Sequence, residues 1–224
     1  MAKKPPVDKS NPDNLHHEQT LWDKGMEYIA CVDEAGRGPF AGPVVACAAI
    51  MPKGLRIDRL TDSKKLPKTQ HDAFAELVKQ HALYYAVGIV EVDELDEIDN
   101  IKTAARMAMK RAIEGLSVKP DYILVDGTEV IDTEIPQQHV VKGDYHVHGI
   151  SAAAIIAKTY RDDVMKALDE ETNGIYGWAS NAGYETKVHF EACVQHGLTK
   201  HHRKSWRKTL AKLDAIWEIK KDDL

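Results

Sequence analysis

Residues 28–51 read YIACVDEAGRGPFAGPVVACAAIM, two apolar segments separated by a loop rich in glycine and proline. Both segments are rich in Val, Ile, Ala and Cys, a composition typical of neighbouring strands buried on both faces. The first segment runs into two adjacent carboxylates, Asp33 and Glu34, and the loop after them carries Arg37. We therefore expect two central strands, with a polar site where the first one ends.

The rest of the chain alternates between strand and helix patterns. Apolar runs predict further strands within 83–92, 121–126 and 138–143. Helical periodicity predicts helices over 68–82, 101–116, 151–171, 187–195 and 205–221. Strands mixed with helices in this way indicate an α/β fold, in which helices flank a mixed central sheet and a helical portion ends the chain.

The composition is that of an ordinary globular protein. Of the 224 residues, 43% are hydrophobic and 29% are charged, and the formal net charge is −5. No apolar run approaches the ~20 residues of a membrane span, and no apolar signal region is visible, so we expect a cytoplasmic protein. We divide the chain into a polar arm (1–27), an α/β core (28–172) and a C-terminal helical region (173–224).

One segment near the C-terminus is basic although the chain is acidic. Its basic residues are Lys187, Lys200, Arg203, Lys204, Arg207 and Lys208, against the single acid Glu191. Such a run is either a solvated helix surface or a surface for a polyanion, and the sequence leaves both interpretations open.

Two more carboxylates follow apolar runs and lie beside glycine. Asp126 closes the run 121–126, and Asp144 comes just after the run 138–143. Each could be an ordinary turn residue, but strand ends are also where ligands are held in α/β proteins. Because successive side chains on a strand point to opposite faces, we expect the first strand to end at Asp33, so that Asp33 and Glu34 reach one site.

Four carboxylates in one place would repel one another unless cations neutralised them. Oxygen ligands of this kind suit Mg²⁺ or Mn²⁺ rather than zinc. Two such cations ~4 Å apart are the usual arrangement for phosphodiester cleavage. The pattern therefore favours a site for divalent cations.

The cysteines and histidines show no recognisable zinc motif. We expect Cys31, Cys47 and Cys193 to be small buried residues, since they are odd in number and lie in separate contexts. The neighbouring histidines are His16 with His17, His146 with His148, and His201 with His202. These pairs lack the flanking cysteines, or the helical spacing of two histidines, that zinc sites use.

Taken together, motifs along most of the chain resemble ribonuclease HII, the bacterial type 2 ribonuclease H family. The motifs are VDEAGRGPFAGPVVACA, TDSKKL, VDG, VKGD, ISAAAIIAKTYRD, AGYETKVH and HHRKSW, within residues 28–208. The resemblance implies a ribonuclease H-like fold and a metal-dependent endonuclease, a hydrolase. It would cut the RNA strand of RNA–DNA hybrids and the 5′ side of single ribonucleotides embedded in duplex DNA, as in ribonucleotide excision repair, leaving 3′-hydroxyl and 5′-phosphate ends.

The resemblance also implies roles for individual residues. The catalytic and metal-binding set would be Asp33, Glu34, Asp126 and Asp144, holding Mg²⁺ or Mn²⁺, two ions per site, with Asp33 bridging them. The substrate-binding set would be Gly36, Arg37, Gly38, Tyr184, Ser63, Lys64, Lys65 and Asn100. In that set, the glycine loop and Tyr184 sense the ribose 2′-hydroxyl. The last four contact the nucleic acid backbone, or form an ordinary capped loop. A monomer is expected.

The chain departs from the usual family pattern at four positions, none of them a carboxylate. These are Ala105, Ala154, Ala182 and Trp206, in place of threonine, serine, lysine and phenylalanine. Ala105 is expected on a helix that faces the duplex, and Ala182 lacks a phosphate contact next to the tyrosine. In the helix 151–171, we expect Lys158, Arg161 and Asp162 to brace the site through ion pairs rather than to contact substrate.

Two other interpretations remain. The chain could bind hybrids without cutting them, although the complete carboxylate set argues against this. It could instead be a type 3 ribonuclease H, which handles single ribonucleotides poorly. That family carries a sizeable N-terminal substrate-binding domain, whereas only 27 mostly polar residues precede the first predicted strand.

Overall fold

This computed structural model describes residues 14–60 and 66–222, with side chains as far as residue 218. Ser63, Lys64 and Lys65 of the predicted substrate-binding set lie outside the described residues. The chain forms two compact units that interleave along the sequence. The first unit comprises Met1–Ala35, Val45–Ile89 and Arg106–Thr159, and the second comprises Gly36–Val44, Val90–Ala105 and Tyr160–Leu224.

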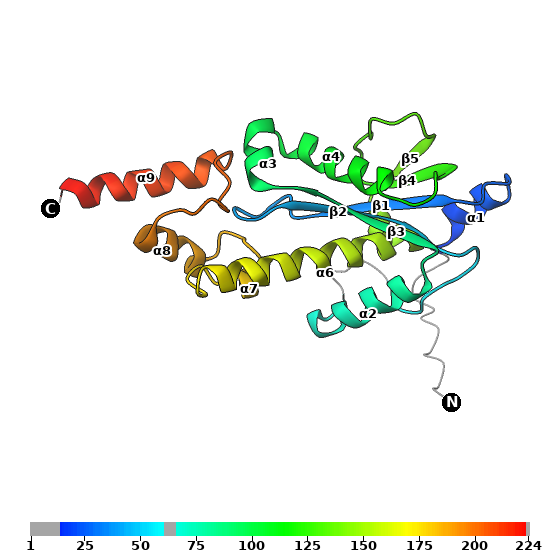
Figure 1. Cartoon of the computed structure of the whole chain (residues 1–224), viewed down its shortest axis with the longest axis horizontal. Helices are drawn as coiled ribbons and strands as arrows, with labels where there is room; N and C mark the ends of the chain where they lie inside the picture. The colour runs from blue at the N-terminus through cyan, green and yellow to red at the C-terminus, as the bar shows by residue number, and fades with distance from the viewer. Residues whose placement is uncertain (1–13, 61–65, 223–224) are drawn as a thin grey trace. The chain divides into compact units, whose positions relative to one another are not determined.

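A five-stranded mixed sheet, in the order β3-β2-β1-β4-β5, is the centre of the first unit (Figure 1). The strands are β1 (Ile29–Ala35), β2 (Val44–Ile50), β3 (Tyr84–Val90), β4 (Tyr122–Asp126) and β5 (Gln137–Val140). β1 pairs antiparallel with β2 and parallel with β4, and β4 pairs parallel with β5. The predicted mixed α/β architecture is confirmed.

The strand β1 is longer than its sequence suggested. It continues through Glu34 and Ala35, which pair with Ala46 and Val45 of β2. The expectation that it stops at Asp33 was wrong, because β2 is buried along its whole length and pairs with β1 past the acidic residues. Asp33 and Glu34 therefore leave a regular strand on opposite faces.

The helices are α1 (His16–Trp22), α2 (Lys68–His81), α3 (Val92–Ile98), α4 (Ile101–Glu114), α5 (Gly143–His146), α6 (His148–Glu171), α7 (Trp178–Asn181), α8 (Lys187–His196) and α9 (Arg207–Asp222). The five predicted helices are all present, whereas α1, α3, α5 and α7 were not predicted. Within the described residues, no helix has both the length and the apolar character that crossing a bilayer requires.

Helices cover both faces of the sheet in the first unit. α2 and the first half of α6 lie on one side, where Ala75, Val78 and Ile155 pack against Cys47 and Ala49 of β2. α4 lies on the other side, against β3. Gly88 allows this approach, since a Cβ there would stand 2.1 Å from the carbonyl oxygen of Ala108.

Part of the predicted polar arm belongs to the hydrophobic core of the first unit. Leu21 and Trp22 of α1 are buried with Ile29 and Leu124 of the sheet. Glu18, also buried, accepts a hydrogen bond from the backbone N–H of Gly149 at 2.9 Å, in the first turn of α6. This carboxylate satisfies a helix N–H that has no partner within α6.

The second unit has a separate core built largely from aromatic side chains. Phe40, Tyr176, Trp178, Cys193 and Leu213 are buried together, and they come from the loop after β1, from the α7 region, and from α8 and α9. The rings of Tyr176 and Trp178 stack, with centroids 4.9 Å apart. This core supports the segment that contains Tyr184.

Candidate active site

The sheet brings two of the predicted carboxylates together in the first unit. Val32 of β1 is in register with Val125 of the parallel strand β4. Asp33 and Asp126 follow these two residues directly, so their side chains leave the sheet on the same face. Asp144 lies in the first turn of α5, a few residues after β5 rather than at the strand end itself.

Asp33 lies in an environment that disfavours its ionised form. Its side chain is buried, and burial raises its pKa well above the usual range. The negative charges of Glu34, Asp126 and Asp144 raise the pKa further, and only a hydrogen bond from the Glu34 N–H lowers it. Three carboxylates therefore act electrostatically on Asp33, and positive charge nearby would stabilise its ionised form.

Backbone hydrogen bonds fix the position of Asp126 relative to Asp144. Asp126 Oδ1 accepts the backbone N–H of Gly143 at 2.6 Å and that of Asp144 at 3.4 Å. Gly143 permits this contact, since a Cβ there would lie 2.6 Å from a methyl carbon of Ile150. The hydroxyl of Ser151 donates to the Asp144 carbonyl at 2.8 Å, which ties the short helix α5 to α6.

In the second unit, the glycine loop after β1 is held by a buried arginine. Arg203 is fully buried and donates to the carbonyls of Gly36 at 2.6 Å and Gly42 at 2.8 Å. It also donates to the carbonyls of Arg37 and Pro43. Burial lowers the pKa of Arg203 to about 9, and the positive charge of Arg161 contributes. The guanidinium group still carries its charge at neutral pH.

A second buried arginine holds the same loop from α6. Arg161 donates to the carbonyls of Ala41 at 3.0 Å, Pro43 at 2.9 Å and Ala182 at 2.9 Å. Arg161 thus braces the loop, as the sequence suggested, but its hydrogen bonds go to backbone carbonyls rather than to carboxylates. Gly36 has φ +95°, and a Cβ there would lie 2.2 Å from Arg161 Nε. Another residue at position 36 would therefore displace the guanidinium group.

Tyr184 lies directly against this loop. A Cβ on Gly38 would stand 3.2 Å from Tyr184 Cε1 and 3.7 Å from its hydroxyl oxygen, so the ring covers Gly38. The side chain of Tyr184 is 52% exposed, although large apolar surfaces are usually buried. Three of the predicted hydroxyl-sensing residues, Gly36, Gly38 and Tyr184, therefore share one face of the second unit, and Arg37 lies between the two glycines.

Two further predicted positions have structural roles. The side-chain oxygen of Asn100 accepts the backbone N–H groups of Lys102 at 3.0 Å and Thr103 at 3.1 Å, so it caps α4. Ala105 is completely buried in α4, and the expectation that this helix faces the duplex stays a prediction. Helix α4 turns this position toward the protein interior, because small residues there allow close packing.

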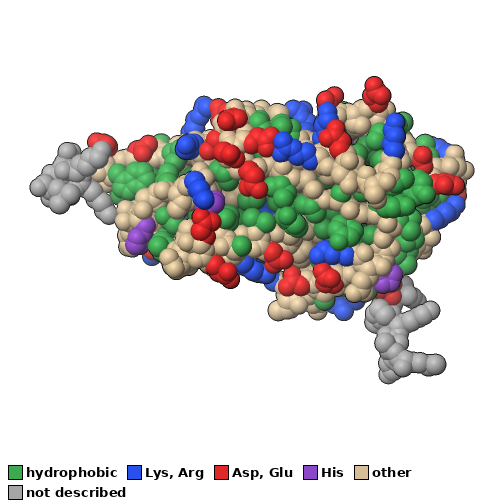
Figure 2. All heavy atoms as spheres, viewed as in Figure 1, with side chains coloured by type: hydrophobic (Ala, Val, Ile, Leu, Met, Phe, Trp, Pro, Cys, Tyr) green, Lys and Arg blue, Asp and Glu red, His purple; other side chains and the backbone are tan. Residues whose placement is uncertain are grey.

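The basic segment is less basic at its surface than its sequence indicates. Lys187 pairs with Glu191, Lys200 with Glu171, and Arg207 with Asp99. Arg203 is buried under the glycine loop and is not part of the surface. On the face drawn in Figure 2, acidic and basic side chains are likewise interspersed. The surface-helix interpretation therefore accounts for most of the segment.

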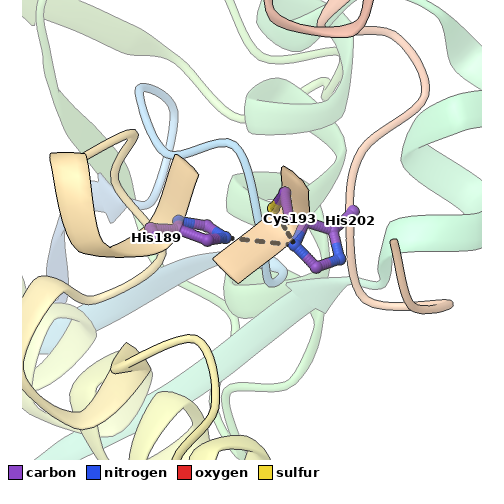
Figure 3. A group of neighbouring side chains, drawn as sticks. All are labelled: His189, Cys193 and His202. Carbon is purple, nitrogen blue, oxygen red and sulfur yellow. Dashed lines mark hydrogen bonds between the residues drawn. The ribbon is translucent and has the colours of Figure 1, made fainter. Parts of the chain in front are cut away.

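Sequence reasoning missed a buried group in the second unit, made by His189, Cys193 and His202 (Figure 3). Their donor atoms lie within 4.8 Å of one another, and among the described residues this is the one such group of three or more potential ligands. The spacing of His189 and Cys193 by four residues on a predicted helix placed them on one face. Nothing in the sequence indicated that His202 would join them. All three cysteines are free and buried, as predicted.

Comparisons with known proteins agree with the motifs. The family model described as ribonuclease HII matches residues 30–209. A ribonuclease HII from Myxococcus xanthus is 47% identical over 86% of this chain and 65% of its own length. One from Alkaliphilus oremlandii is 46% identical over 84% of this chain and 95% of its own length.

A solved structure has the same architecture. The crystal structure of the ribonuclease H2 from Pyrococcus horikoshii OT3 superposes with a TM-score of 0.67 at 25% identity. The alignment covers 84% of this chain and 99% of that one. The likeness therefore extends over nearly the whole of the archaeal structure.

Proposed function

We propose, because this chain belongs to the ribonuclease HII family of metal-dependent nucleases, that it cleaves RNA within RNA–DNA hybrids and on the 5′ side of single ribonucleotides in duplex DNA. The products would carry 3′-hydroxyl and 5′-phosphate ends. The observation that carries the proposal is geometric: Asp33 is buried and follows β1 residue Val32, which is in register with Val125, the residue before Asp126 in β4. A site of this kind requires cations to be fully charged.

The donor set fits Mg²⁺ or Mn²⁺. These ions prefer carboxylate oxygens, and Mg²⁺ in particular is usually held by one or two carboxylates, with substrate phosphates and waters completing its coordination. Asp33 lies within electrostatic reach of Glu34, Asp126 and Asp144, so four carboxylates would be available for two ions to share. When bound, the cations would activate the attacking water and stabilise the leaving oxygen.

The residues of the chain have separate tasks in this scheme. Asp126 is held by the Gly143 N–H, so that its second carboxylate oxygen is directed by the protein rather than by solvent. Asp144 is held through its carbonyl by Ser151. The Asp126 carboxylate and the Asp144 backbone are thus held before substrate arrives, which reduces the reorganisation that cleavage requires.

Choice of substrate is assigned to the loop Gly36–Gly38 and Tyr184. Only the 2′-hydroxyl distinguishes a ribonucleotide from a deoxyribonucleotide at a given position. The backbone of Gly38 is bare and exposed, and the Tyr184 ring and hydroxyl lie over it. A ribose at this place would meet backbone N–H groups and a phenol, both of which hydrogen-bond to a hydroxyl.

Two other functions, a type 3 ribonuclease H and a binding module without catalysis, are less well supported. A type 3 ribonuclease H is disfavoured because the matching family model and the relatives at 46–47% identity are ribonuclease HII. A binding module without catalysis is disfavoured because the acidic cluster would repel the phosphates that such a module binds. A monomeric state and a cytoplasmic location remain predictions.

Mapping of cleavage sites tests the proposal. Two matched duplexes are required, one with a single ribonucleotide in DNA and one with a continuous RNA strand, each assayed with Mg²⁺ and with Mn²⁺. We expect a single cut on the 5′ side of the isolated ribonucleotide. Tyr184→Ala should slow that cut by about tenfold or more while changing duplex affinity much less. If the wild-type chain cuts only the duplex with a continuous RNA strand, the proposed activity on single ribonucleotides is refuted. If Tyr184→Ala loses cleavage and duplex affinity equally, the assignment of the tyrosine is refuted.

A further inference from the structure

The buried group His189, Cys193 and His202 has the composition of a zinc site, but the directions of its hydrogen bonds decide otherwise. Zinc binds through lone pairs of histidine nitrogens and through thiolates. Each of the two rings has a nitrogen that faces a backbone group able only to donate or only to accept a hydrogen bond. The position of every ring hydrogen therefore follows from the partners.

His202 carries its hydrogen on Nε2. The backbone N–H of Thr199 points to His202 Nδ1 at 2.9 Å, and a backbone N–H can only donate. Nδ1 is therefore the acceptor, and in a neutral ring Nε2 bears the hydrogen. That N–H is directed at His189 Nε2, 3.1 Å away, and at Cys193 Sγ, 3.3 Å away (Figure 3).

His189 carries its hydrogen on the other nitrogen. Its Nδ1 lies 2.9 Å from the carbonyl oxygen of Tyr184, and a carbonyl can only accept. Nδ1–H is therefore the donor, and Nε2 has a lone pair. That lone pair accepts the indole N–H of Trp178 at 3.0 Å and the N–H of His202. The two rings thus have complementary tautomers.

The same bonds exclude an added proton and disfavour a metal ion. A proton on either ring would place two hydrogen-bond donors face to face. Burial also disfavours the charged rings, and it lowers the pKa of His202 to about 3 and lowers the pKa of His189. A metal ion would need the lone pair that His202 Nε2 lacks. It would also need the Cys193 thiolate, although burial raises the pKa of this thiol to about 12.

We infer that His189 and His202 are positioning residues for Tyr184, which they hold through a continuous chain of hydrogen bonds from Thr199 to the tyrosine carbonyl. The inference rests on the proposed role of Tyr184 in sensing the 2′-hydroxyl. The tyrosine carbonyl is 2.9 Å from the ring nitrogen that holds it, so movement of the ring moves the backbone that carries the phenol.

Phe40 connects this chain of bonds to the glycine loop. Its ring packs on both histidine rings, with centroids 5.7 Å from His189 and 5.1 Å from His202. Its backbone N–H donates to the carbonyl of Gly183, the residue before Tyr184, at 2.8 Å. Through Phe40, the histidine pair therefore fixes the position of the tyrosine relative to the glycine loop.

A double-mutant cycle tests the inference. His189→Leu removes the donor to Tyr184, whereas His189→Asn keeps an N–H near the position of Nδ1. On the duplex with one ribonucleotide, we expect His189→Leu to lower kcat about tenfold, with duplex affinity within about twofold, and His189→Asn to recover most of the loss. In a Tyr184→Ala background, His189→Leu should cause no further loss, because the two residues act as one unit.

A matched control is Cys193→Ala. The chain of bonds to Tyr184 does not run through this thiol, so the variant should keep kcat within about twofold. A loss of kcat as large as that of His189→Leu, together with zinc bound stoichiometrically to the wild-type chain, would overturn the inference in favour of a metal site.

The outcomes separate the two proposals. If Tyr184→Ala itself leaves the single-ribonucleotide cut unchanged, the proposed role of the tyrosine fails. If Tyr184→Ala is damaging but the effect of His189→Leu simply adds to it, only the positioning role fails. NMR of isotope-labelled histidines in the wild-type chain adds a test that needs no variant. It should show hydrogen on Nδ1 of His189 and on Nε2 of His202, and any other pair of tautomers contradicts the inference.

Discussion

Two clusters of ionisable side chains in this molecule have opposite character. In the first unit, Asp33 is buried among carboxylates whose charges all raise its pKa. In the second unit, His189 and His202 are buried as neutral rings, with partners for every nitrogen. The ionised carboxylates of the first cluster repel one another unless positive charge is added, whereas the hydrogen bonds of the second cluster are satisfied without any ligand.

The difference shows how a ligand site can be told from a structural network. Residue types alone would favour the histidine and cysteine group as a metal site, because its three donor atoms lie within 4.8 Å of one another. Electrostatics favours the carboxylates, since a cation would relieve their repulsion but would break the hydrogen bonds of the histidine group. Adding cations should therefore stabilise the carboxylate cluster and not the histidine group, and acidification should affect the stability contributed by the two clusters in opposite directions.

The largest expected effect is the loss of cleavage rate when a carboxylate of the acidic cluster is replaced. Asp126→Asn keeps an oxygen that can accept the Gly143 N–H but removes a charge, so cleavage should fall by on the order of a thousandfold or more. The free energy of unfolding should stay the same or rise, because one repulsive charge near Asp33 is gone. Activity is measured on the duplex with one ribonucleotide, and stability by urea unfolding without metal. Undiminished cleavage in Asp126→Asn would show that Asp126 is not part of the active site.

A loss of stability is expected from the arginine under the glycine loop. Arg203→Met leaves the carbonyls of Gly36 and Gly42 without their buried donor, which should lower the free energy of unfolding by about 3 kcal/mol. Lys208→Met, an exposed position in the same segment, is the matched control and should change it by less than about 0.5 kcal/mol. Equal values for the two variants would show that the loop does not depend on Arg203.

A more gradual effect, spread over several pH units, is the dependence of stability on pH. Burial lowers the pKa of His148 to about 4 and that of His202 to about 3, from 6.5 in an exposed histidine. As the pH falls below 6.5, the unfolded chain binds protons that the folded chain does not. The contribution of these histidines to stability is therefore complete above pH 6.5 and decreases below it, by up to about 1.4 kcal/mol per pH unit for each histidine.

The acidic cluster should act in the opposite direction. The raised pKa of Asp33 means that the folded chain binds this proton more tightly, so its protonation favours folding as the pH falls. The decrease in stability on acidification should therefore be steeper in Asp33→Asn than in the wild type. Urea unfolding at a series of pH values measures both slopes. A flat profile in Asp33→Asn would mean that the histidines are not held neutral.

Long apolar runs and helical periodicity made most of the fold predictable. β2 and the first half of α6 are buried almost continuously, and the sequence shows it directly. The short helices α1, α3, α5 and α7 have only four to seven residues, too few for a period to be visible. The end of β1 was misjudged because pairing with β2, not the local sequence, decides where that strand stops.

The candidate site was predictable where one residue type points to one chemistry. Acidic residues after apolar runs identified Asp33 and Asp126, which the parallel strands then place on one face. The partners of Arg161 and the buried role of Arg203 were not predictable, because both side chains donate to backbone carbonyls, which every residue has. The histidine network was missed for a similar reason, since it depends on a loop that returns His202 to α8.

The central claim, that the carboxylates and not the histidine group hold the cations, is tested most directly by thermal unfolding with and without Mn²⁺. A ligand that binds only the folded chain raises the unfolding temperature. We expect Mn²⁺ to raise it in the wild type and in Cys193→Ala, and to have little effect in Asp126→Asn. A rise that persists in Asp126→Asn and disappears in Cys193→Ala would contradict the account.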